Sequence, residues 1–320
     1  MTIDTRALER HRRYEDAQAG ISEEFLQPDL GGARTMAVLS RPLGRTSSVG
    51  WVVCHSFGME QIHLGRQDVI AARALAAAGF PVLRFHGQGY GDSQRGAEAI
   101  GLSSHLAETE GAIRLLQGQE GVERVGMVGA RFGGMVAALL ADRLDLPFMA
   151  LWEPSVRGGL YIRDLLRREL LSKMAAGDGQ VGPAEMERLR GELASRGWTD
   201  IRGFRLSREA YEDISAVDLG KDLTRFSGSA LLIAVSRTER INPAVSKLAQ
   251  HLESLGGRTS VRLVQDQFGG QFGQFRFQTV EGGRGKRDVQ LELNEKVAAA
   301  TVAWCREALG APPMGEQVPA

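Results

Sequence analysis

The chain has 320 residues, of which 43% are hydrophobic and 24% charged, which is typical of a soluble globular protein. Its 39 basic and 39 acidic side chains cancel, so the charge balance favours neither nucleic acid nor an anionic membrane as a partner. The two cysteines, Cys54 and Cys305, lie too far apart in the sequence to suggest a disulfide framework. The polar N-terminus does not resemble a secretion signal, and no apolar run reaches the roughly 18 residues that span a bilayer. These features predict a cytoplasmic protein, with a homodimer among the open oligomeric states.

Segments typical of strands and of helices alternate along the chain. Strands are expected at 23–27, 34–41, 50–55, 81–86, 124–129, 148–153, 230–236 and 260–265, and helices at 67–78, 103–117, from near Phe132, at 243–255 and at 289–308. Such alternation predicts an α/β fold with about eight strands in a mostly parallel sheet that helices cover on both faces.

Residues 155–228 interrupt this pattern. They contain two amphipathic helical segments and then a stretch through Trp198 and Phe204 that we expect to be irregular. We therefore predict a core of residues 1–154 and 229–309, a helical cap at 155–228, and a flexible tail at 310–320.

A glycine-rich turn connects one buried strand to the next helix. The sequence Val128-Gly129-Ala130-Arg131-Phe132-Gly133-Gly134 has the spacing of the nucleophile elbow, G-x-S-x-G, in which small residues permit a sharp turn. Arg131 occupies the position of the nucleophilic serine. Its guanidinium stays protonated and has no acceptor atom, so it is neither a nucleophile nor a base near pH 7.

Two further motifs appear in the order that the α/β-hydrolase superfamily has. Cys54-His55-Ser56-Phe57-Gly58 resembles its oxyanion-hole segment, with Ser56 in place of a glycine, and Phe85 to Ser93 resembles its F-D-x-R-G-x-G-x-S loop, with His86 in place of aspartate. The chain thus resembles this superfamily over nearly its whole length. GARFGG and LWEPSVRGGLYIRDLLRRELL also resemble the hydrolase-like proteins of the exosortase A system, some of which carry arginine in the elbow.

The resemblance implies an acid after the strand ending near Ser236 and a histidine after the last strand. Glu239 is the carboxylate available for the first position, although Thr238 aligns equally well, and Gln271 occupies the second. The chain has no histidine after His251. A standard serine, histidine and acid triad is therefore not expected.

We expect Arg131 to bind an anionic or carbonyl-containing (acyl) ligand at the start of its helix. The alternative is that Arg131 pairs internally with Glu153 or another carboxylate. His86 and His55 are the candidate proton carriers. Ligand contacts are expected from Ser56, Phe57, Phe132, Trp152, Glu153, Glu239 and Gln271. No metal or cofactor is predicted.

Three classes of function remain open at this stage. The first is an unorthodox enzyme that uses Arg131 as an electrostatic group. The second is a catalytically inactive binding or accessory protein. The third is an esterase, thioesterase or acyltransferase with a displaced nucleophile such as Ser56.

Overall fold

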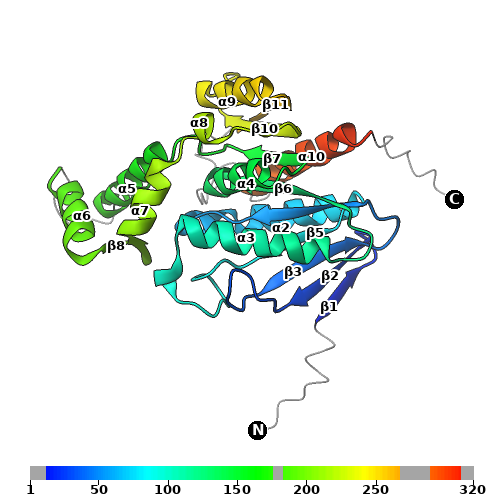
Figure 1. Ribbon diagram of the computed structural model, residues 1–320, viewed down its shortest axis with the longest axis horizontal. Coiled ribbons are helices and arrows are strands. Elements are labelled where there is room, and N and C mark those ends of the chain that lie inside the picture. Colours follow the sequence, from blue (N-terminus) through cyan, green and yellow to red (C-terminus); the bar gives the residue numbers. More distant parts are fainter. Residues whose placement is uncertain (1–11, 176–182, 267–288, 311–320) are drawn as a thin grey trace, which may run out of the picture.

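The computed structural model describes residues 12–175, 183–266 and 289–310, and Figure 1 shows a central sheet with helices on both sides. In these residues the main sheet has nine strands in the order β1-β2-β3-β5-β4-β6-β7-β10-β11, of which the last six are parallel. The strands are β1 (Arg13–Asp16), β2 (Ile21–Leu26), β3 (Ala37–Pro42), β4 (Val49–Cys54), β5 (Val82–Phe85), β6 (Arg124–Ala130), β7 (Phe148–Trp152), β10 (Ser229–Ser236) and β11 (Arg258–Gln265). The predicted α/β fold with a mostly parallel sheet is confirmed.

Two helical layers cover the sheet. One face packs against α3 (Leu102–Gln117), α4 (Arg131–Arg143) and α9 (Pro243–Ser254), and the other against α2 (Met59–Ala77) and α10 (Val289–Ala308). Every residue of β4 and β7 is buried, which explains why both strands are continuous apolar runs. Because both faces are covered, the carboxyl ends of the parallel strands are the place left for a ligand.

The residues between β7 and β10 are those predicted as a cap, a name kept for them below, and α5, α6, α7 and β8 of this segment lie at one end of the molecule in Figure 1. Its elements are α5 (Gly158–Ala175), α6 (Pro183–Arg196), β8 (Trp198–Ile201), β9 (Phe204–Ser207), α7 (Arg208–Ala216) and α8 (Leu219–Asp222). Buried cap residues such as Tyr161 and Ile214 belong to the same hydrophobic cluster as Met135 of α4. The cap is thus packed onto the core by a shared apolar contact.

The expectation of an irregular stretch through Trp198 and Phe204 was wrong, because these residues begin the two strands of an antiparallel hairpin. The turn consists of Arg202 and Gly203, which both have positive φ, at 54° and 84°. Two such residues form the turn that matches the twist of paired strands. The aromatic and β-branched residues on either side were the overlooked signal.

Two boundaries at the N-terminal side also differ from the expectation. The sheet has an additional edge strand, β1, which pairs with β2. Helix α2 begins at Met59, eight residues before the expected start at 67, so that Glu60 lies in its first turn. Within the described residues, no helix has both the length and the apolar character that crossing a membrane requires.

Candidate functional site

The site is built on the sharp turn between β6 and α4. Arg131 is the first residue of α4 and has φ of 52°, a conformation that side chains other than glycine rarely adopt. A Cβ atom added to Gly129 would lie 2.3 Å from the carbonyl oxygen of Gly133, and one added to Gly133 would lie 2.3 Å from that of Cys54. Glycine is therefore required at both positions, and the turn has the strained geometry expected of a nucleophile elbow.

Arg131 pairs with a carboxylate on a neighbouring helix. Its Nε lies 3.2 Å from Oε1 of Glu60, and its Nη2 lies 3.6 Å from Oδ2 of Asp164. Burial opposes the charge, but Glu60, Tyr161 and Asp164 together more than compensate, so the pKa of the Arg131 guanidinium is held above its ordinary value. The guanidinium is a permanent cation next to the elbow.

Glu60 is the centre of a small ionic cluster, which we call the inner cluster and define as Glu60, Arg131, Tyr161, Asp164 and Arg168. Arg168 lies 3.3 Å from the same Oε1 atom as Arg131 and also pairs with Asp164, while the Tyr161 hydroxyl donates to Oε2 of Glu60 at 3.0 Å. Burial and the adjacent carboxylate raise the pKa of Tyr161, so its phenol keeps its proton. Two arginines balance two carboxylates, and the cluster connects the core helices to α5 of the cap.

Glu153, the partner named in the sequence-based alternative, has a different role. It begins the connection after β7 with φ of 44°, and its Oε1 accepts a hydrogen bond of 2.6 Å from the Val235 backbone. Burial raises the pKa of Glu153, although the Val235 hydrogen bond and the charge of Arg131 oppose the shift. The main partner of Arg131 is Glu60, which the sequence analysis missed because it placed this residue before the helix.

A cavity of about 720 Å³ lies between the elbow, the start of the cap and α9. Basic side chains outnumber acidic ones in its wall, with five against two. The lining residues are Arg131, Pro154, Ser155, Val156, Arg157, Leu160, Tyr161, Arg163, Asp164, Asp218, Gly220, Lys221, Asn242, Pro243, Ala244, Lys247, Leu248 and His251. The volume is that of a typical small-molecule site.

His55 does not reach this cavity. It is 2% exposed, its Nε2 lies 2.8 Å from Oε1 of Glu108, and its ring lies 4.3 Å from that of His105. Burial lowers the pKa of His105 to about 4, so that ring is neutral at physiological pH. These three residues are the one group in the described chain whose donor atoms could together hold a metal ion. Two of the ring nitrogens already have protein partners, because His55 Nε2 meets Glu108 and His105 Nδ1 lies 2.6 Å from the Gly101 carbonyl oxygen.

His86 also lies outside the cavity wall. Its Nδ1 accepts a hydrogen bond of 3.4 Å from the Asp92 backbone, and the side chain is 39% exposed. Burial of the rest of the ring lowers the pKa of His86, although Asp92 opposes the shift. Neither candidate proton carrier therefore faces Arg131 across the cavity.

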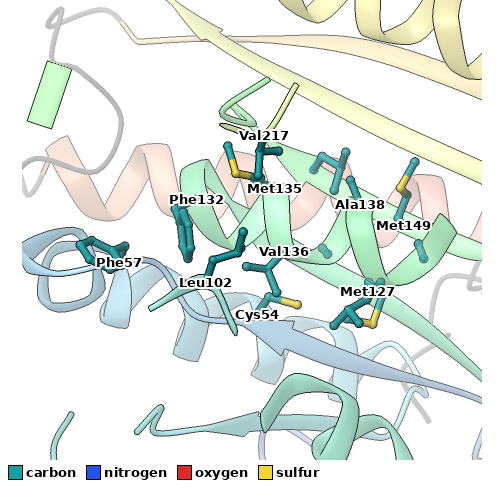
Figure 2. Close-up of a cluster of buried hydrophobic side chains, with 14 of the residues drawn as sticks. Cys54, Phe57, Leu102, Met127, Phe132, Met135, Val136, Ala138, Met149 and Val217 are labelled. Atoms are coloured by element: carbon teal, nitrogen blue, oxygen red, sulfur yellow. The ribbon is translucent and has the colours of Figure 1, made fainter. Parts of the chain in front are cut away.

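The expected ligand contacts of the elbow are mostly core residues. Phe57, Phe132 and Trp152 are at most 2% exposed, and Figure 2 shows Phe132 lying among the apolar side chains of α4 and its neighbours. The Ser56 hydroxyl donates to the Ala130 carbonyl at 2.7 Å, and its backbone N–H donates to the Gln61 side chain at 3.0 Å. Both polar groups of Ser56 are engaged within the protein, which argues against a displaced nucleophile.

Glu239 and Gln271 occupy the positions expected for the acid and the histidine, and neither is found in the cavity wall of the described structure. Glu239 is exposed and lines a separate groove with Leu263, Val264, Gln265 and Lys296. Gln271 lies outside the described residues. Of all the predicted site residues, Arg131 is the one that the described structure places in the cavity wall.

The cap residues of the site were not predicted, although the sequence contained a signal for them. Tyr161, Asp164 and Arg168 are separated by three and four positions, a spacing that places side chains on one face of a helix. Two charged groups and a phenol on one face of a helix predict a polar contact. Their partner Glu60 is 101 positions away from Tyr161 in the sequence, so no local pattern identifies it.

Comparisons with known proteins agree with the fold. No family model matches the chain, and no curated protein sequence matches it significantly. Est1E from Butyrivibrio proteoclasticus with bound ferulic acid superimposes with a TM-score of 0.60 at 15% identity, over 89% of this chain and 99% of that one. Proline iminopeptidase from Mycobacterium smegmatis gives 0.54 at 16% identity, over 90% and 100% of the two chains. DcsB in complex with its substrate analogue gives 0.54 at 13% identity, over 89% and 99%. At these identities the likeness establishes architecture, and the chain has the α/β-hydrolase fold.

Proposed function

We propose that this protein binds a small anionic molecule, such as a carboxylate or an acyl compound with an anionic group, in the cavity next to Arg131. The observation that carries the proposal is the excess of basic side chains in the cavity wall, five against two acidic ones. A concave site lined by one sign of charge concentrates ligands of the opposite sign. No covalent serine step is part of the proposed function, because the elbow carries an arginine.

Binding is better supported than unorthodox catalysis. Acid–base catalysis needs a group of suitable pKa within hydrogen-bond reach of the substrate. Neither His55 nor His86 lines the cavity, and the one histidine in the described wall, His251, uses its Nε2 in a 2.9 Å hydrogen bond with the Leu223 carbonyl. The predicted role of these two histidines as proton carriers therefore has no geometric support.

The decisive test is isothermal titration calorimetry of small carboxylates and phosphates against the wild type and cavity variants. Arg131 belongs to the inner cluster, so the informative changes are Arg163→Gln and Lys247→Gln, which remove exposed cations of the wall. Arg45→Gln, on the exposed connection between β3 and β4, is the matched control. Binding that weakens in both cavity variants and not in the control supports the proposal. Absence of binding by every anion tested refutes it.

A second measurement separates this proposal from hydrolase chemistry. A fluorophosphonate probe reacts with an activated serine, and we expect no labelling of the wild type. We also expect Arg131→Ser to lack esterase activity, since the chain has no histidine after His251 to act as its base. Stoichiometric labelling of the wild type would instead favour an acyl-transferring enzyme with a displaced nucleophile. The resemblance to the exosortase A system stays a prediction.

A further inference from the structure

Three basic side chains of the cavity wall lack a charged partner in the described part of the chain. Arg157, Arg163 and Lys247 are exposed and form no ion pair or side-chain hydrogen bond with any described residue. We call them the outer cations. They come from separate parts of the chain: Arg157 directly precedes α5, Arg163 lies in its second turn, and Lys247 lies in α9. Since like charges repel, three such side chains around one cavity are stabilised when an anion joins them.

The acidic residues of the wall are already engaged. Asp164 pairs with Arg131 and Arg168 of the inner cluster. Asp218 caps α8 by accepting the Gly220 N–H at 3.2 Å, and it lies 3.7 Å from the ammonium of Lys221. Neither carboxylate forms an ion pair with an outer cation, so these three positive charges have no directly paired partner among the described residues.

Apolar side chains form another part of the same wall. Pro154, Val156, Pro243 and Leu248 line it, and Leu160 is 47% exposed although it is a large apolar residue. An apolar surface in a ligand site is covered when a ligand brings an apolar segment of its own. The cavity thus combines several cations with an apolar surface.

We propose that the ligand is a phosphate monoester with an apolar segment. This inference rests on the proposed function and specifies the class of anion that is bound. A phosphate monoester carries about −1.5 to −2 charges near pH 7 and three acceptor oxygens, whereas a carboxylate carries one charge and two oxygens. The charge of the three outer cations is therefore closer to that of a phosphate monoester than to that of a carboxylate. The apolar segment would cover Leu160 and Leu248.

The test compares hexyl phosphate, hexanoate and inorganic phosphate by calorimetry on the full chain at pH 7.5 and constant ionic strength. We expect hexyl phosphate to bind about tenfold more tightly than either of the others, since each lacks one of the two recognised features. Arg163→Gln and Lys247→Gln should each weaken hexyl phosphate about fivefold to tenfold, and Arg45→Gln should leave it unchanged. Thermal unfolding of each variant checks that the fold is intact.

The outcomes separate the two proposals. Hexanoate binding as tightly as hexyl phosphate would overturn the phosphate assignment but leave anion binding in place. Inorganic phosphate binding as tightly as hexyl phosphate would overturn the apolar segment. Hexyl phosphate binding that neither cavity variant weakens would place the ligand elsewhere and overturn the inference. If none of the three anions binds, both the inference and the proposed function fail.

Discussion

The outer cations line the same cavity as three members of the inner cluster, Arg131, Tyr161 and Asp164, but the two groups differ in how their charges are paired. In the inner cluster two arginines meet two carboxylates, and Glu60 alone has three partners. The outer cations have no charged partner among the described residues. Buried charges that are paired belong to the architecture of a protein, whereas exposed and unpaired charges in a concavity are available to a ligand. This difference indicates that Arg131 stabilises the fold, whereas the outer cations are the groups available to the proposed ligand.

The largest effect should come from removing the centre of the inner cluster. Glu60→Gln leaves two nearly buried guanidinium groups without their shared carboxylate, and we expect the free energy of unfolding to fall by about 3 kcal/mol. Urea denaturation followed by circular dichroism measures it. Glu110→Gln is the control, because Glu110 pairs with Arg114 and Arg143 at the surface and should contribute under about 1 kcal/mol. Equal losses in the two variants would mean that the inner cluster is no more structural than a surface pair.

The elbow that holds Arg131 should be almost as sensitive. Gly133→Ala places a Cβ atom 2.3 Å from the Cys54 carbonyl oxygen, so the backbone must shift, at a cost of about 2 to 3 kcal/mol. Gly191→Ala on α6 is the matched control, since nothing lies within 4 Å of its added atom and alanine favours a helix. Thermal denaturation of both variants measures the contrast. A fully stable Gly133→Ala protein would show that the turn can relax, contrary to the geometry described above.

Helix α2 carries a second buried acid, Asp68, whose protonation should make stability depend on pH. Asp68 lies two turns after Glu60, and burial raises its pKa to about 7, against the opposing charges of His55 and Arg84. Between about pH 4 and pH 7 the folded state keeps this proton while the unfolded chain loses it, so wild-type stability falls as pH rises. Asp68→Asn removes this dependence. We expect its stability relative to the wild type to increase by about 2.7 kcal/mol from pH 5 to pH 8, because about two pH units lie below the folded pKa and each corresponds to about 1.4 kcal/mol. Urea denaturation at both pH values tests this, and an unchanged difference would contradict it.

The smallest effect is expected at the outer cations. Arg163→Gln and Lys247→Gln should change the free energy of unfolding by less than about 0.5 kcal/mol, because neither side chain is buried or paired with a described residue. The sign should be slightly stabilising, since each change reduces repulsion among like charges. Differential scanning calorimetry without ligand provides the measurement. A loss above 1 kcal/mol would assign these side chains to the architecture and remove the contrast with the inner cluster.

The sequence predicted the fold well because its signals are local. Continuous apolar runs identified the buried strands β4 and β7, and the glycines around Arg131 identified the elbow. The hairpin β8–β9 was missed because it lies within a segment dominated by helical periodicity. Its signal was the Arg202-Gly203 turn between β-favouring residues.

The candidate site was predicted only at Arg131, since its other parts depend on distant contacts. Glu60 and Arg131 are 71 positions apart in the chain. Lys247 lies in α9, which follows the cap in the sequence, and it lines the same cavity. His55 directly follows β4 at the expected edge of the sheet, yet its ring turns inward to Glu108. The side-chain direction depends on which neighbour offers a hydrogen bond, and sequence position alone does not specify it.

The positive φ of Arg131 has a consequence for protein engineering. The conformation is imposed by the crossing of β6 and α4 with the glycines at 129 and 133, and so it does not depend on having a serine there. The backbone at position 131 therefore places its side chain at the start of α4 and beside α5. A residue substituted at position 131 would keep this placement, so the design problem is to add the neighbouring groups that the intended reaction or ligand requires.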